Sequence, residues 1–166
     1  KGQPGNVRCA LQERAARLHR PALSVNPRNA IEQRRDFAHG VIALAQPGQA
    51  IGIVDTAVDP AHPALVGADV RRQAFVTAGK EAASADHGTA VAALLVGQPD
   101  SVVPGLVPRA RVFAAAPFHT LPSGNATADT AGLVKSLDWL VGQGVAVIGM
   151  SLAGPDNAVL RAAVRR

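Results

Sequence analysis

Ile51-Gly-Ile-Val-Asp-Thr-Ala-Val-Asp59 is the stretch that decides the fold of this chain. The run Ala50–Val54 is continuously apolar and bounded by turn residues, which is typical of a strand buried in a parallel sheet. Such a strand delivers Asp55 to the carboxyl edge of the sheet, where sites form in α/β folds. A second stretch, Asp86-His-Gly-Thr-Ala-Val-Ala92, places His87 at the start of a helix of small residues. An acid and a histidine placed in this way are two thirds of a charge-relay site.

Strands and helices alternate through the rest of the chain, with turn residues between them. Apolar runs predict further strands at 70–76, 111–116 and 145–149, the last of them buried. Helical spacing of apolar residues predicts helices at 87–96, 129–141 and 156–166. This alternation is typical of a three-layer α/β fold, in which helices flank a mainly parallel sheet. The last helix has no closing cap or turn after it, so we expect an incomplete domain.

Positive charge is concentrated near the N-terminus. Residues 1–35 hold eight Lys and Arg against two Glu, whereas residues 36–166 hold nine against ten acidic residues. We therefore expect a basic, largely helical segment at 1–48 and a separate domain at 49–166.

Aromatic residues make up only 3% of the chain, which argues against base stacking and a nucleic-acid partner. No apolar run approaches the ~20 residues of a membrane span, and Cys9 is the single cysteine, so no internal disulfide forms.

The pairing of Asp55 with His87 predicts a specific chemistry. A carboxylate that follows an apolar strand is costly to bury unless a donor compensates it, and an imidazole is a natural donor. Neutral imidazole is the usual general base near pH 7, and an acid bonded to its other nitrogen fixes the tautomer. The pair therefore predicts a proton-transfer site that needs a nucleophile.

One alternative supplies that nucleophile from within the chain. Gly149-Met-Ser-Leu-Ala153 follows a predicted strand and resembles a Gly-x-Ser-x-Gly nucleophile elbow with Ala in the last place. Ser151 would then be the nucleophile of an esterase with an α/β-hydrolase fold. Such enzymes place their acid and histidine after the serine, yet no His follows Ser151.

A second alternative is a hydrolytic metal site. The candidate ligands are Asp55, Asp59, His62 and His87. Their spacing matches no strong metal signature, and His62-Pro63 suits a turn.

Three motifs of this chain resemble those of the subtilisin-like serine peptidases, the subtilases. Asp55-Thr-Ala-Val-Asp59 with His62-Pro63 is similar to the aspartate motif, and His87-Gly-Thr-Ala-Val-Ala92 is similar to the histidine motif. Val147-Ile-Gly-Met-Ser-Leu-Ala-Gly-Pro155 resembles the strand that lines the substrate cleft. The Asp-then-His order is that of subtilisin, and the resemblance covers about residues 49–166.

The resemblance implies a serine endopeptidase that hydrolyses bonds in a peptide or protein substrate. His87 would accept the proton of a serine hydroxyl, and Asp55 would orient the imidazole. The residues that would line the cleft and pair with an extended peptide are Ser151, Leu152, Ala153 and Gly154. The family's nucleophile and oxyanion-hole residue lie downstream, so we expect them beyond Arg166 and expect this chain alone to be inactive. A pseudo-peptidase that binds peptides without cleaving them is the non-enzymatic alternative.

Four positions depart from the family pattern. Ala57 and Ala153 stand where Gly is usual, and the second change should narrow the substrate cleft. Gly149 stands where Asn is common. Ala64 replaces an Asp that ligates calcium in some members, so we expect no cofactor and doubt a calcium site here. The family resemblance also implies a secreted or periplasmic protein.

Overall fold

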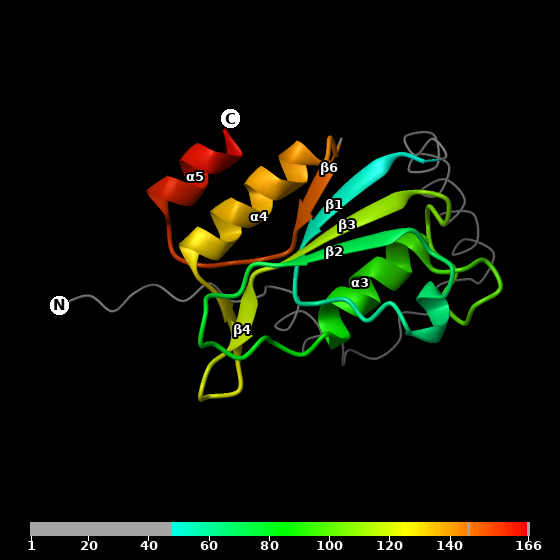
Figure 1. Cartoon of the computed structure of the whole chain (residues 1–166), viewed down its shortest axis with the longest axis horizontal. Helices are drawn as coiled ribbons and strands as arrows, with labels where there is room; N and C mark the ends of the chain where they lie inside the picture. Colours follow the sequence, from blue (N-terminus) through cyan, green and yellow to red (C-terminus); the bar gives the residue numbers. More distant parts are fainter. Residues whose placement is uncertain (1–47, 146, 166) are drawn as a thin grey trace, which may run out of the picture.

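The computed structural model of the chain describes residues 48–145 and 147–165, with a parallel sheet between helices (Figure 1). The basic segment predicted at 1–48, including Cys9, lies outside the described residues except for Gly48. Within the described part, no helix is both long and apolar enough to cross a membrane.

Four strands form the sheet in the order β2-β3-β1-β6, and every neighbouring pair is parallel. The strands are β1 (Ala50–Val54), β2 (Val70–Ala74), β3 (Arg111–Ala116) and β6 (Val147–Met150). The helices are α3 (Asp86–Val96), α4 (Thr130–Gly142) and α5 (Ala158–Val164). All of these elements lie within two residues of their predicted bounds. The predicted three-layer α/β fold is thereby confirmed.

Alternate residues of β3 pack on opposite faces of the sheet, because successive side chains of a strand point to opposite sides. Val112 and Ala114 belong to a core cluster with α3, whereas Phe113 and Ala115 belong to a cluster with α4 and α5. Figure 1 shows α3 on one side of the sheet and α4 with α5 on the other. The two hydrophobic cores hold the sheet as a middle layer, and the strand ends meet at one edge.

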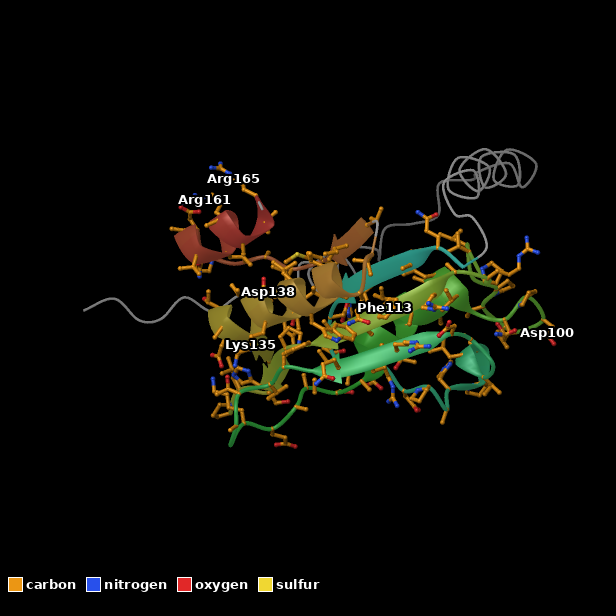
Figure 2. The ribbon with its side chains drawn as sticks, turned by 45° about the horizontal axis from the view of Figure 1, so that its top comes forward. Asp100, Phe113, Lys135, Asp138, Arg161 and Arg165 are labelled. Atoms are coloured by element: carbon orange, nitrogen blue, oxygen red, sulfur yellow. The ribbon has the colours of Figure 1, made fainter. Side chains whose placement is uncertain are left out.

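Helix α4 packs closely on the sheet through its apolar side. Its Leu133, Leu137 and Leu140 are buried, while Lys135 and Asp138 are exposed (Figure 2). In β1, a Cβ atom at residue 52 would lie 3.1 Å from a methyl carbon of Leu140, so glycine there permits the close approach.

The prediction that the strand at 145–149 is buried is wrong. Within the described residues β6 is an edge strand and pairs only with β1. Its residues are alternately exposed and half-buried, and Val147 is 61% exposed. An apolar run therefore predicted the strand but not its place in the sheet.

A short antiparallel hairpin was not predicted. It consists of β4 (Phe118–Thr120) and β5 (Ala126–Ala128), which follow β3 directly. A 3-10 turn, η1 (Pro63–Leu65), was not predicted either. The hairpin matters for function because it lies beside the ends of β1 and α3, as described next.

Candidate active site

Asp55 lies directly after β1, where the strand delivers it to the carboxyl edge of the sheet. Its backbone N–H donates to Ala115 O at 3.1 Å, which extends the pairing with β3 by one residue. The residue is only 6% exposed. Its Oδ1 accepts a hydrogen bond from the backbone N–H of Thr56 at 2.7 Å. A carboxylate is thus held in a buried position with a fixed orientation.

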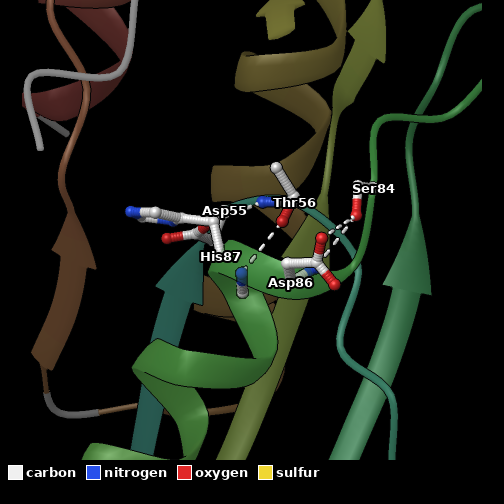
Figure 3. Close-up of polar contacts among 6 residues, drawn as sticks. Asp55, Thr56, Ser84, Asp86 and His87 are labelled. Carbon is white, nitrogen blue, oxygen red and sulfur yellow. Dashed lines mark hydrogen bonds and ion pairs between the residues drawn. The ribbon is translucent and has the colours of Figure 1, made fainter. Parts of the chain in front are cut away.

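His87 is the second residue of α3, and its ring meets Asp55. His87 Nδ1 lies 2.6 Å from Asp55 Oδ1 (Figure 3). This contact joins residues 32 positions apart in the sequence. The His87 side chain is 29% exposed, so the imidazole reaches from a buried partner toward the surface. Because Nδ1 faces the carboxylate, Nε2 is the nitrogen on the opposite side of the ring.

The His-Gly-Thr sequence brings α3 against the loop that follows β1. A Cβ atom at residue 88 would lie 2.4 Å from Thr56 O and 2.6 Å from Ala57 O, so only glycine permits this approach. Gly88 N–H donates to Thr56 Oγ1 at 2.9 Å, and Asp59 N–H donates to Thr89 Oγ1 at 2.8 Å. The sequence prediction missed Thr56 and Thr89, whose contacts span about the same separation as the Asp55–His87 pair.

Ser151 lies at this site as well. It lines one small pocket together with Asp55, His87 and two residues of the hairpin, Phe118 and Ala126. The segment predicted to bind substrate therefore begins beside the imidazole.

The remaining predicted substrate-binding residues lie slightly further away. Leu152, Ala153 and Gly154 line a neighbouring groove against α5. Ala153 and Gly154 are exposed, and Leu152 is half-buried and packs against the α4 core cluster.

The nucleophile-elbow alternative is not supported by the backbone. An elbow places its serine on a sharp, strained turn between a strand and a helix. Here β6 ends at Met150, and α5 begins only at Ala158. No non-glycine residue of the described chain has a positive φ, Ser151 and Ala57 included. Alanine at position 57 is consequently unstrained, although the family usually has glycine there.

The proposed metal ligands are not gathered into one cluster. Asp59 Oδ1 accepts from Ala61 N at 2.9 Å, and His62 Nδ1 accepts from Ala64 N at 3.3 Å, so both side chains stabilise the turn before η1. In residues 48–145 and 147–165, no group of three His, Cys, Asp or Glu side chains could hold a metal ion.

A second histidine and carboxylate lie near the hairpin. His119 in β4 is 3% exposed, and its Nδ1 makes no hydrogen bond with the described residues. Burial lowers the pKa of His119, the positive charge of Lys80 lowers it further, and Asp129 partly offsets both. Hydrogen bonds from Lys80 and Thr77 lower the pKa of Asp129. Asp129 is therefore held ionised mainly by Lys80 and Thr77, and His119 contributes less to its lowered pKa.

Comparison with known sequences gives one family. The sequence model of the Subtilase family matches residues 46–166. No curated protein matches the chain.

The solved structures that the chain resembles include two proteases. A mutant of the protease domain of PatA is 27% identical, with a TM-score of 0.60, over 73% of this chain and 46% of that one. The prenylagaramide maturation protease PagA is 24% identical, with a TM-score of 0.59, over 77% of this chain and 45% of that one. The second likeness concerns the fold alone. The chain thus spans less than half the length of either structure.

Proposed function

Because this chain belongs to the subtilase family, we propose that it carries the acid and the base of a serine endopeptidase site. The observation that carries the proposal is the 2.6 Å contact between Asp55 Oδ1 and His87 Nδ1. This is the arrangement in which a buried carboxylate fixes the tautomer of a general base.

In the proposed reaction, Nε2 of His87 accepts the proton of a serine hydroxyl as the oxygen attacks the carbonyl carbon of a peptide bond. Asp55 stabilises the imidazolium that forms, and His87 then donates the proton to the leaving amine. The acyl-enzyme is hydrolysed by the same steps with water as the nucleophile. We propose that the serine comes from the part of the full-length protein that corresponds to the unmatched portion of the PatA and PagA structures.

The proposed substrate is an extended peptide or protein segment that lies along residues 151–154. This segment begins in the pocket that Asp55 and His87 line, and its Ala153 and Gly154 are exposed, which supports its role as a cleft wall. Backbone pairing with an extended peptide needs such an accessible segment. PatA, which is 27% identical to this chain, is a patellamide maturation protease, and this likeness supports a peptidic substrate.

A fluorophosphonate probe tests the reaction, because it labels only an activated serine. With the full-length protein, we expect labelling at a serine outside residues 1–166, and we expect His87→Ala to abolish it. Labelling at Ser151 would favour the esterase alternative instead. If no serine is labelled while a peptide still binds, the protein is a pseudo-peptidase and the proposal is wrong.

Two expectations from the family resemblance are also proposals. We propose that no calcium binds at the His62–Ala64 turn, because Ala64 offers no side-chain oxygen and His62 Nδ1 already accepts from the backbone. Calcium-dependent changes in the backbone NMR signals of residues 59–65 would contradict this.

We also propose, from the family resemblance, that the protein is secreted or periplasmic. Fractionation of the native cells tests this location.

A further inference from the structure

The N-cap residue of helix α3 makes no capping hydrogen bond with its side chain. The first N–H groups of any helix need partners from outside it. In α3 the N-cap residue is Ala85, whose side chain makes no capping hydrogen bond. Ser84 Oγ accepts from Asp86 N, but at 3.3 Å. The start of the helix that carries His87 therefore depends on groups elsewhere in the chain.

Thr56 supplies one such group and contacts Asp55 at the same time. Its Oγ1 accepts from the backbone N–H of Gly88, the residue next to His87, at 2.9 Å. Its own backbone N–H donates to Asp55 Oδ1 at 2.7 Å. Thr56 is 8% exposed, so water competes little for either bond. One residue thus connects the carboxylate with the helix that presents the imidazole (Figure 3).

Thr89 makes the reciprocal connection. It belongs to α3, is buried, and accepts at Oγ1 from the backbone N–H of Asp59 at 2.8 Å. The loop from Asp55 to Asp59 is therefore joined to the first turn of α3 near both of its ends. Between these bonds, Gly88 lies against the backbone of Thr56 and Ala57 with no room for a side chain.

We propose that Thr56 and Thr89 are positioning residues that set the distance between Asp55 and His87. Neither hydroxyl touches the reacting atoms; both act through the placement of α3 relative to the end of β1. The expected effect on the reaction rate rests on the proposed function. The expected effect on the distance between Asp55 and His87 does not. A misplacement of about 1 Å at a reacting group costs about 10²-fold in rate, so two hydroxyls at this junction matter for catalysis.

Thr56→Val in the full-length protein tests the proposal, because valine keeps the shape and removes the acceptor. We expect kcat to fall about 10- to 100-fold with little change in KM. We expect Thr56→Ser, which keeps the hydroxyl, to retain most of the kcat of the unsubstituted protein. Thr89→Val gives a smaller loss of the same kind, because its bond is further from the carboxylate.

A spectroscopic measurement reads the geometry without any activity. The proton shared between His87 Nδ1 and Asp55 gives a far-downfield NMR signal, which His87→Ala identifies by its loss. We expect Thr56→Val to shift or broaden that signal and Thr56→Ser to retain it. The matched control is Thr77→Val, since Thr77 Oγ1 also bonds a residue at a helix start, Asp129 Oδ2 at 2.6 Å. Neither residue lines the site pocket or the groove beside it.

The outcomes separate the two proposals. Unchanged kcat and an unchanged downfield signal in both Thr56→Val and Thr89→Val would overturn the positioning role, as would an equal loss in Thr77→Val. If the unsubstituted full-length protein cleaves no peptide, the proposed function fails, and the downfield signal alone decides the positioning role. If Thr56→Val does not fold, the pair Thr89→Val and Thr89→Ser carries the same comparison.

Discussion

Two histidines of the described chain, His87 and His119, each lie near an aspartate, and the two pairs are organised in opposite ways. Oδ1 of Asp55 lies 2.6 Å from Nδ1 of His87. The carboxylate of Asp129 accepts hydrogen bonds from Lys80 Nζ at 2.9 Å and from Thr77 Oγ1 at 2.6 Å. His119 near this second carboxylate keeps an Nδ1 without a hydrogen bond to any described residue.

The difference shows that residue type and proximity do not make a proton-transfer site. In the first pair, the carboxylate is buried and the imidazole is partly exposed, so the proton-accepting ring reaches a pocket. In the second pair the order is reversed, since the carboxylate is partly exposed and the imidazole is buried. A buried imidazole beside a lysine favours the neutral form but has no access to a substrate.

Asp55→Asn is expected to have the largest effect on the comparison. The amide removes the negative charge and favours the wrong imidazole tautomer, so kcat of the full-length protein should fall about 10⁴-fold. The matched change in the second pair, Asp129→Asn, should leave kcat unchanged. Steady-state kinetics on a peptide substrate measures both. Equal losses in the two variants would show that the pairs do not differ in function.

Gly88→Ala should break the first pair by steric means. The new Cβ would meet Thr56 O at 2.4 Å and Ala57 O at 2.6 Å, both backbone atoms that cannot move aside without shifting the loop. We expect the free energy of unfolding to fall by about 3 kcal/mol, as for a severe overpacking substitution. Urea unfolding of the full chain measures it.

Gly142→Ala at the end of α4 is the control for this effect. No atom lies within 4 Å of a Cβ there, and alanine favours a helix over glycine. It should be neutral or stabilising. A Gly88→Ala variant as stable as Gly142→Ala would mean that α3 does not lie against the loop as closely as described.

The first pair could be predicted from the sequence because each partner follows a strong local pattern. The apolar run before Asp55 and the small-residue helix after His87 determine their elements without reference to the rest of the chain. The contacts of Thr56 and Thr89 were not predictable in the same way. A threonine carries no signal for which backbone N–H, 30 or more residues away, its hydroxyl will meet.

The surroundings of the second pair were missed because β4 and β5 are too short to show a period. Each has three residues, fewer than the alternation of a strand needs to be recognised. The signal that could have found them is the turn Leu121-Pro-Ser-Gly-Asn125 between them, where Gly124 has φ of 80°. The exposure of β6 was missed for another reason, since an apolar run does not say whether a strand is central or at an edge.

His119→Leu tests the second pair and should have the smallest of the three effects, a change in how the free energy of unfolding depends on pH. Burial and then Lys80 lower the pKa of His119 in the folded state, whereas the unfolded chain keeps a value near 6.5. Below pH 6.5 the unfolded chain therefore binds more protons, so the stability of the folded state is full above this pH and declines as the pH falls toward the folded-state pKa. Leucine removes this contribution, and the loss of stability between pH 7.5 and pH 5 should become smaller in urea unfolding of the variant. The loss from the lowered pKa of Asp129 falls mainly near and below its unfolded-state value of 3.8, so Asp129 contributes little in this window. The difference between the variant and the unsubstituted chain is therefore due to His119. An unchanged pH dependence in His119→Leu would show that the ring exchanges its proton as freely in the folded chain as in the unfolded one.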